Sequence, residues 1–322
     1  MQATLFHQNS TGGLAMNNRR NFLKQAVAAS AGLAMLGLPE KLLAGTDLLR
    51  LTILHTNDIH CQIDPFPDNH PVNAGKGGLA RLSGRIQQIR NEQSNVLLLD
   101  CGDMFQGTPY FNFYKGELIL KIMSEMGYEA STLGNHEFDN GLDALHRALD
   151  YAKFPIVNSN YDFSQTKLYD RFNRYVVYRK GGIKIGVYGL GVEMQGLVSD
   201  ANCEGVVYND PATVALEMEA FLKLEKNCDL IICLSHLGLK YESSKISDIT
   251  LAPKTHYTNL ILGGHTHSFL DQPIELTNAR GKPVLINQAG WGGMVLGRID
   301  FVFDKSGKQE PIALASPAYN HS

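Results

Sequence analysis

The 322-residue chain is poor in cysteine, in net charge and in long hydrophobic runs, and each shortage excludes a class of protein. Its five cysteines form no Cys-x-x-Cys pair, which argues against a disulfide framework and a cysteine-only zinc site. The 29 basic and 32 acidic residues nearly cancel, so no general basic field is available for nucleic acid or an anionic membrane. With 44% hydrophobic and 19% charged residues, the composition excludes a disordered or collagen-like chain and predicts a globular protein.

A short apolar stretch near the N-terminus predicts an export signal. The stretch from Ala26 to Leu38 is shorter than the roughly 20 residues that a membrane-spanning helix needs. A basic segment, Arg19-Arg20-Asn21-Phe22-Leu23-Lys24, precedes it, and the small-residue exit Leu43-Ala44-Gly45 follows it, as in a cleavable signal peptide. The paired arginines resemble a twin-arginine signal, which implies export to the periplasm. An ordinary secretory signal or a retained amphipathic anchor is the alternative, and we expect no stable membrane anchor.

The expected domain boundaries follow from this signal. Residues 16–45 form the predicted signal peptide, and residues 1–15 are an uncertain upstream segment because Met16 offers an alternative start. The mature chain then begins near Thr46. No linker divides residues 46–303, which we expect to form a single catalytic domain, and residues 304–322 read as a polar C-terminal tail.

Apolar, β-branched runs alternate with helical patterns through the rest of the chain, which predicts an α/β domain with layered sheets. The predicted strands are Leu51–Leu54, Val96–Leu99, Ser131–Leu133, Ile156–Val157, Ile183–Leu190, Leu230–Leu234, Leu260–Leu262, Val284–Ile286 and Val295–Phe303. The predicted helices are Leu79–Asn91, Glu117–Met126, Leu142–Ala152 and Pro211–Glu225. Asp210 is the expected N-cap of the last helix, with Pro211 in its first position.

Five polar clusters each follow one of the predicted strands. They are Asn57-Asp58-Ile59-His60, Asp100-Cys101-Gly102-Asp103, Gly134-Asn135-His136-Glu137-Phe138-Asp139, Ser235-His236 and Gly263-Gly264-His265-Thr266-His267. Taken singly, each has an ordinary explanation, such as a strand-end cap, turn chemistry or a buried histidine with a hydrogen-bond partner. Their shared position after strands favours one common functional site over five unrelated features, because groups beyond the carboxyl ends of strands in an α/β sheet converge on one crevice. Five of the 11 histidines fall inside these clusters.

The residue types in the clusters suit a pair of divalent metal ions. Carboxylate, amide and neutral imidazole are mixed oxygen and nitrogen ligands, which fit zinc, manganese or iron better than calcium. Seven such side chains would serve two metal sites, and they are Asp58, His60, Asp103, Asn135, His236, His265 and His267. His136 is then free beside the site for acid chemistry.

The order of these motifs resembles the calcineurin-like metallophosphoesterases. Within that superfamily four segments resemble the 5′-nucleotidase branch, namely Leu54-His55-Thr56-Asn57-Asp58-x-His60, Gly102-Asp103-x-x-Gln106-Gly107-Thr108, Gly134 to Asp139 and Gly264-His265-Thr266-His267. Asn287-Gln288-Ala289-Gly290 before the last strand fits the branch too. The resemblance implies a metallophosphatase-like sandwich of two mixed β-sheets flanked by helices, and it runs from about Leu49 to Phe303.

The resemblance also implies a role for each site residue. Asp58, His60 and His267 would hold one metal, Asn135, His236 and His265 the other, and Asp103 would bridge them. His136 matches the family's catalytic histidine, and Asp139 matches the carboxylate that orients it.

We therefore expect a dinuclear-metal hydrolase that dephosphorylates nucleoside 5′-monophosphates or related small phosphoesters with metal-activated water. One alternative is a cyclic-nucleotide or general phosphodiesterase with the same metals. Another, of a different class, is a non-catalytic metal-binding partner subunit, which the completeness of the nine side chains disfavours.

Members of the nucleotidase branch usually carry a second, C-terminal domain that supplies substrate contacts. This chain ends some twenty residues past Val295–Phe303, so we expect that domain to be absent from it. A separately encoded domain that docks on this chain is the favoured explanation; a protein acting alone on varied phosphoesters, or a reduced pocket, is the alternative. Trp291 and the segment from Asp64 to Gly78 are candidate walls of such a pocket, and packing beneath a glycine-rich loop explains Trp291 equally well.

Overall fold

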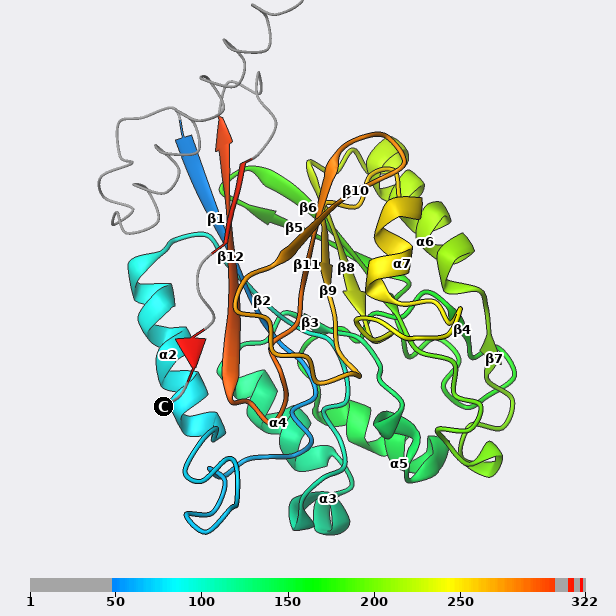
Figure 1. Ribbon diagram of the computed structural model, residues 1–322. Coiled ribbons are helices and arrows are strands. Elements are labelled where there is room, and N and C mark those ends of the chain that lie inside the picture. The colour runs from blue at the N-terminus through cyan, green and yellow to red at the C-terminus, as the bar shows by residue number, and fades with distance from the viewer. Residues whose placement is uncertain (1–47, 305–311, 316–318, 321–322) are drawn as a thin grey trace, which may run out of the picture. The chain divides into compact units, whose positions relative to one another are not determined.

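The computed structural model describes residues 48–304, 312–315 and 319–320, and its centre is a pair of large β-sheets (Figure 1). The first sheet has the order β13-β12-β1-β2-β3, and β14 also pairs with β12. Its strands are β1 (Leu48–Thr56), β2 (Val96–Asp100), β3 (Ala130–Ser131), β12 (Val295–Asp304), β13 (Ile312–Ala315) and β14 (Tyr319–Asn320). β1 is parallel to β2 and antiparallel to β12, so the sheet is mixed.

The second sheet is also mixed and has the order β10-β11-β9-β8-β6-β5. Its strands are β5 (Tyr175–Lys180), β6 (Ile183–Leu190), β8 (Leu230–Ser235), β9 (Leu260–Leu262), β10 (Ile274–Thr277) and β11 (Pro283–Asn287). β6, β8, β9 and β11 run parallel, while β5 and β10 close the two edges antiparallel. A short ribbon of β4 (Tyr161–Asp162) and β7 (Val207–Tyr208) stands apart from both sheets.

Successive side chains of the strands point to opposite faces, and this alternation builds the layers. Leu51 and Ile53 of β1 are fully buried in one cluster with Ile232 of β8, so this cluster lies between the sheets. Leu54 of β1 and Leu98 of β2 belong instead to a cluster on the outer face of the first sheet. Each such fully buried side chain stabilises the fold by roughly 1.5–3 kcal/mol.

Helices cover the outer face of each sheet, as Figure 1 shows for α2 beside β1 and for α6 and α7 beside β8. The helices are α2 (Leu79–Glu92), α3 (Pro109–Tyr114), α4 (Glu117–Met126), α5 (Gly141–Ala148), α6 (Pro211–Ala220) and α7 (Asp248–Leu251). Short 3₁₀ segments are η2 (His136–Phe138), η3 (Leu149–Tyr151), η4 (Asp200–Asn202) and η6 (Ala252–Lys254), and a π-helical segment, η5 (Phe221–Glu225), extends α6. The predicted sandwich of two mixed sheets flanked by helices is confirmed.

Most predicted elements are present, and the departures have local causes. The predicted strand Ile156–Val157 makes only isolated bridges, to Ser131 and Asn173, since Pro155 just before it cannot donate to a ladder. The predicted helix Pro211–Glu225 changes to π-helical geometry after Ala220. Asp210 caps that helix as predicted, its side chain accepting a hydrogen bond from the backbone N–H of Thr213 at 2.8 Å.

The chain ends bear on the predicted boundaries in different ways. The upstream segment 1–15 and the predicted signal 16–45 lie outside the described residues. In the part that is described, no helix is long and apolar enough to cross a bilayer. Within residues 304–322, Asp304 ends β12, and β13 and β14 pair with β12.

Candidate metal centre

The polar clusters that follow the strands come together at one edge of the two sheets. β1 leads into Asp58 and His60, β2 into Asp103, β3 into Asn135 and His136, β8 into His236, and β9 into His265 and His267. The carboxyl ends of parallel strands share an edge, so five loops that are distant in sequence meet there.

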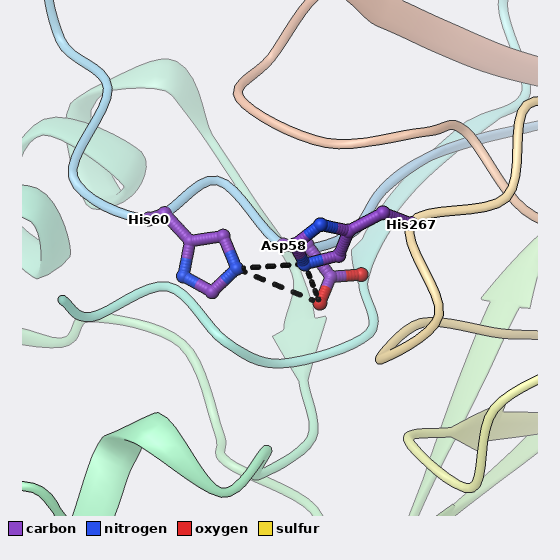
Figure 2. Close-up of side chains that lie close together, drawn as sticks. All are labelled: Asp58, His60 and His267. Atoms are coloured by element: carbon purple, nitrogen blue, oxygen red, sulfur yellow. Dashed lines mark hydrogen bonds and ion pairs between the residues drawn. The ribbon is translucent and has the colours of Figure 1, made fainter. Parts of the chain in front are cut away.

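Asp58, His60 and His267 form a first ligand group, whose ligand atoms all lie within 4.8 Å of one another. Figure 2 shows the two imidazoles pointing toward each other beside the Asp58 carboxylate, with His60 Nε2 and His267 Nε2 3.0 Å apart. Oδ1 of Asp58 is 3.3 Å from His267 Nε2 and 3.8 Å from His60 Nε2. One carboxylate oxygen and two imidazole nitrogens converging in this way suit a divalent transition-metal ion.

Asp103, His236 and His265 form a second ligand group of the same kind, again within 4.8 Å. Nε2 of His236 lies 3.0 Å from Asp103 Oδ2 and 3.9 Å from Asp58 Oδ1. The backbone N–H of His265 donates to both Asp58 carboxylate oxygens, at 3.1 and 3.0 Å. The two groups are therefore neighbours in one site, and Asp58 lies on their common boundary.

Backbone carbonyls orient two of the candidate histidines. His60 Nδ1 is 3.0 Å from the carbonyl oxygen of Phe105, and His236 Nδ1 is 2.6 Å from that of Cys101. A carbonyl can only accept, so each Nδ1 carries a hydrogen, and Nε2 turns its lone pair toward the pocket when the ring is neutral.

The protonation of these histidines follows from burial and charge. Burial, as the main cause, lowers the pKa of His60, and it lowers the pKa of His265 to about 4, with His236 contributing in the same direction. Burial also opposes a charge on His236, but Asp103 outweighs it and raises the His236 pKa to about 10. The Asp103 carboxylate thus favours a positive charge at His236 Nε2, and a proton and a metal cation would compete for this nitrogen.

One buried atom gives an independent test of whether a metal fits here. Oδ1 of Asn135 is buried and has no hydrogen-bond partner among the described residues, whereas the buried Nε2 of His236 has Asp103 Oδ2 at 3.0 Å. Buried polar atoms in proteins are nearly always partnered, so Asn135 Oδ1 calls for a ligand. Asn135 lies next to His136, whose backbone N–H donates to Asp103 Oδ1 at 2.8 Å. A cation held by the second group would satisfy this oxygen, and the donor set therefore fits a metal.

His136 and Asp139 form a hydrogen-bonded pair beside the first group. Nδ1 of His136 is 2.7 Å from Asp139 Oδ2, and the His136 ring packs edge-on against His60 with ring centroids 5.3 Å apart. Burial opposes a charge on this half-buried ring, but the hydrogen bond to Asp139 and the charge of Asp103 outweigh it, so the His136 pKa is raised. This arrangement suits a proton donor.

Two supporting side chains were not among the sequence-based candidates. Asn57 Nδ2 donates to Asp58 Oδ2 at 2.6 Å and to the carbonyl of Gly290, which ties the end of β1 to the loop after β11. The buried Glu137 carboxylate accepts four backbone N–H bonds, from Asp103, Met104, Phe105 and Gly134. Both residues stand inside the motifs quoted above, so their position was visible in the sequence although their contacts were not.

Comparison with known proteins assigns the family. Residues 51–269 match the calcineurin-like phosphoesterase family, which is more than half of the chain. The chain therefore belongs to that family, and the predicted enzyme class, a hydrolase of phosphoric esters, is confirmed.

The chain is also similar to individual nucleotidases. The chain is 35% identical over 278 residues to a 5′-nucleotidase of Rattus norvegicus, across 80% of this chain and 47% of that protein. Among solved structures it is similar to a 5′-nucleotidase precursor from Thermus thermophilus, with a TM-score of 0.72, 32% identity, and 84% and 55% of the two chains covered. It is also similar to the NAD nucleotidase of Haemophilus influenzae, with a TM-score of 0.71, 27% identity, and 85% and 50% covered. The chain spans about half the length of the curated relatives that it matches.

Proposed function

We propose that the chain hydrolyses nucleoside 5′-monophosphates or related small phosphoesters with two divalent cations held by the paired ligand groups. The observation that carries the proposal is their adjacency, with Asp58 Oδ1 3.9 Å from Nε2 of His236 in the other group. Paired metal sites in phosphatases place their ions roughly 3.5–4 Å apart, which requires two ligand sets in one pocket.

Each candidate residue has a place in this proposal. Asp58, His60 and His267 would hold one cation, Asn135, His236 and His265 the other, and Asp103 would bridge them. Zinc, manganese and iron are the metals that this mixture of carboxylate, amide and imidazole ligands suits.

The chain's own groups would handle the proton of the leaving group. Bound divalent cations lower the pKa of water toward neutrality and offset negative charge on phosphoryl oxygens. Nδ1 of His136 is engaged by Asp139, which leaves Nε2 as the nitrogen that faces a substrate. The raised pKa of His136 favours the doubly protonated ring, and the leaving alkoxide would take the proton on its Nε2.

The substrate class rests on the relatives. The relatives described above are 5′-nucleotidases and an NAD nucleotidase, which supports a small phosphorylated substrate, a nucleotide first of all. A cyclic-nucleotide or general phosphodiesterase with the same metals is the second enzymatic candidate. A non-catalytic metal-binding subunit is disfavoured because all nine candidate side chains are present.

A substrate panel tests the proposal. The purified protein is stripped of metal with a chelator, given Mn²⁺ or Zn²⁺, and assayed on AMP, cyclic AMP, p-nitrophenyl phosphate and bis-p-nitrophenyl phosphate. We expect hydrolysis of the monoesters to exceed that of the diesters, to vanish with the chelator and to return with metal. Faster diester hydrolysis would favour the phosphodiesterase, and hydrolysis that persists in chelator would refute the metal-dependent chemistry.

We also propose that a separately encoded nucleotidase domain completes the substrate pocket. The domain meant is the part of the 5′-nucleotidase relatives that the chain does not match, about half of their length. AMP hydrolysis measured with and without a candidate partner domain tests it. A large rise in activity on mixing is expected, and strong, selective AMP hydrolysis by this chain alone would refute it.

Export through the twin-arginine route is a further proposal, with residues 16–45 as the signal, residues 46–303 as the catalytic domain and residues 304–322 as a polar tail that carries β13 and β14. Replacing Arg19 and Arg20 by lysine should keep the protein in the cytoplasm, which cell fractionation would detect. Unchanged periplasmic recovery of that variant would point to another export route.

A further inference from the structure

Trp291 is the only tryptophan of the chain, and it stacks on a candidate metal ligand. Its ring lies nearly parallel to that of His267, with centroids 5.6 Å apart and planes inclined by 15°. Offset stacking of this kind is a preferred aromatic geometry, and it fixes the plane of a neighbouring ring. His267 is also the ligand of the first group most open to water, with 40% of its side chain exposed against 7% for His60.

The indole is itself held in place relative to Asp58. The residues on either side of it are hydrogen-bonded to the loop that follows β1: Asn57 Nδ2 donates to the Gly290 carbonyl at 2.6 Å, and the Gly292 N–H donates to the Asp58 carbonyl at 2.7 Å. Trp291 also meets the buried Phe66 edge-on, with centroids 5.1 Å apart. Trp291 therefore forms a fixed surface beside the first ligand group.

His267 differs from the other candidate histidines in how its ring is oriented. Carbonyl oxygens hold Nδ1 of His60 and of His236. For Nδ1 of His267, no hydrogen-bond acceptor is found among residues 48–304. An exposed ring without such a partner can rotate about its side-chain torsions, unless packing restricts it.

We propose that Trp291 is a positioning residue of the first metal site, whose indole face sets the ring plane of His267 so that Nε2 meets Asp58 and His60. The inference rests on the proposed ligand set and extends it to a residue outside the quoted motifs. Stacking on Trp291 orients the ring of His267, as a hydrogen bond to a backbone carbonyl orients the rings of His60 and His236. Losing it frees the His267 ring, so the cation at the first group should bind more weakly while the second group is unaffected.

The experiment compares Mn²⁺ binding by the wild type, Trp291→Leu and Trp291→Phe, with Tyr169→Leu as the control for loss of an exposed aromatic ring elsewhere. Electron paramagnetic resonance of free Mn²⁺ counts the bound ions without relying on catalysis. We expect Trp291→Leu to lower the affinity for one of the two bound ions by roughly tenfold or more, the usual effect of losing a group that orients a metal ligand. Trp291→Phe, which keeps a stacking face, should restore most of the affinity, and Tyr169→Leu should match the wild type.

The tryptophan emission gives a second readout that needs no variant of Trp291. Paramagnetic Mn²⁺ bound at His267 should quench the single indole in the wild type, and His267→Ala should abolish the quenching. The inference would be overturned if Trp291→Leu bound both ions with wild-type affinity, or if bound Mn²⁺ left the tryptophan emission of the wild type unchanged. Either result would leave the proposed function standing. A wild type that binds no Mn²⁺ would overturn the proposed function as well.

Discussion

Five of the seven candidate ligands hold a left-handed backbone conformation, which residues with a side chain rarely adopt. The φ angles are 52° at Asp58, 51° at His60, 54° at Asp103, 69° at His265 and 50° at His267. Such conformations cost of order 1–3 kcal/mol each and persist where the surrounding structure enforces them, often at functional sites. None of these five positions carries a glycine, so the sequence pattern alone gave no sign of the strain.

This strain predicts an ordering of two variants at His267. His267→Ala removes the imidazole but keeps the unfavourable φ of 50°, while His267→Gly removes both. We expect the metal-free glycine variant to be more stable than the alanine variant by about 1 kcal/mol, because a left-handed conformation costs a non-glycine residue about that much. Urea unfolding of the two proteins in chelator measures the difference. An alanine variant at least as stable as the glycine variant would show that this backbone is unstrained.

His136 gives the residue-scale test of the chemistry. His136→Ala removes the ring that donates to Asp139 and leaves the two ligand groups intact. We expect the variant to keep its bound metal and to lose roughly 10²–10⁴-fold in kcat, which is the usual contribution of a general acid. His256→Ala, a half-exposed histidine on another loop, is the control and should keep full activity. Full activity of His136→Ala with metal bound would remove this residue from the mechanism.

Among the secondary-structure elements, long periodic segments were predicted well and short ones were not. The buried strands β6 and β8 and the amphipathic helices α2 and α4 fall within a few residues of their predicted bounds. The edge strands β5 and β10 were missed. Their side chains are mostly half-buried or exposed, so their apolar signal is weak, and neighbouring strands rather than local propensity hold them in the sheet.

The N-cap of α6 gives a prediction at this scale. Asp210 accepts hydrogen bonds from both the backbone N–H and the hydroxyl of Thr213, at 2.8 and 2.6 Å. Asp210→Ala should lower the free energy of unfolding by about 1 kcal/mol, as the loss of an N-cap usually does. Thermal or urea unfolding checks this value. Glu225→Ala, which removes an exposed carboxylate from the far end of the same segment, should change stability by less than about 0.5 kcal/mol; equal effects of the two would contradict the capping role.

At the scale of the whole molecule, the order of the motifs in the sequence predicted that they form one site. The geometry of that site is known only from the folded structure. The five clusters lie on loops as far apart as Asp58 and His267, and the shared edge of two sheets brings them together. The sequence could indicate that convergence because strand ends in α/β folds meet predictably. It could not indicate that Glu137 bonds four backbone amides or that Trp291 faces His267, because such contacts depend on exact loop paths.

The central claim is that the two ligand groups act as one site for two cations, and metal content tests it most directly. Dialysis against Mn²⁺ followed by elemental analysis should find about two ions per wild-type chain, the number that a paired phosphatase site holds. Asp103→Asn removes the carboxylate proposed to bridge them, so both ions should be lost. Asp143→Asn, a change at an exposed ion pair with Lys167, should still hold two. A wild-type chain without bound metal, or an Asp103→Asn chain that retains two ions, would contradict the account.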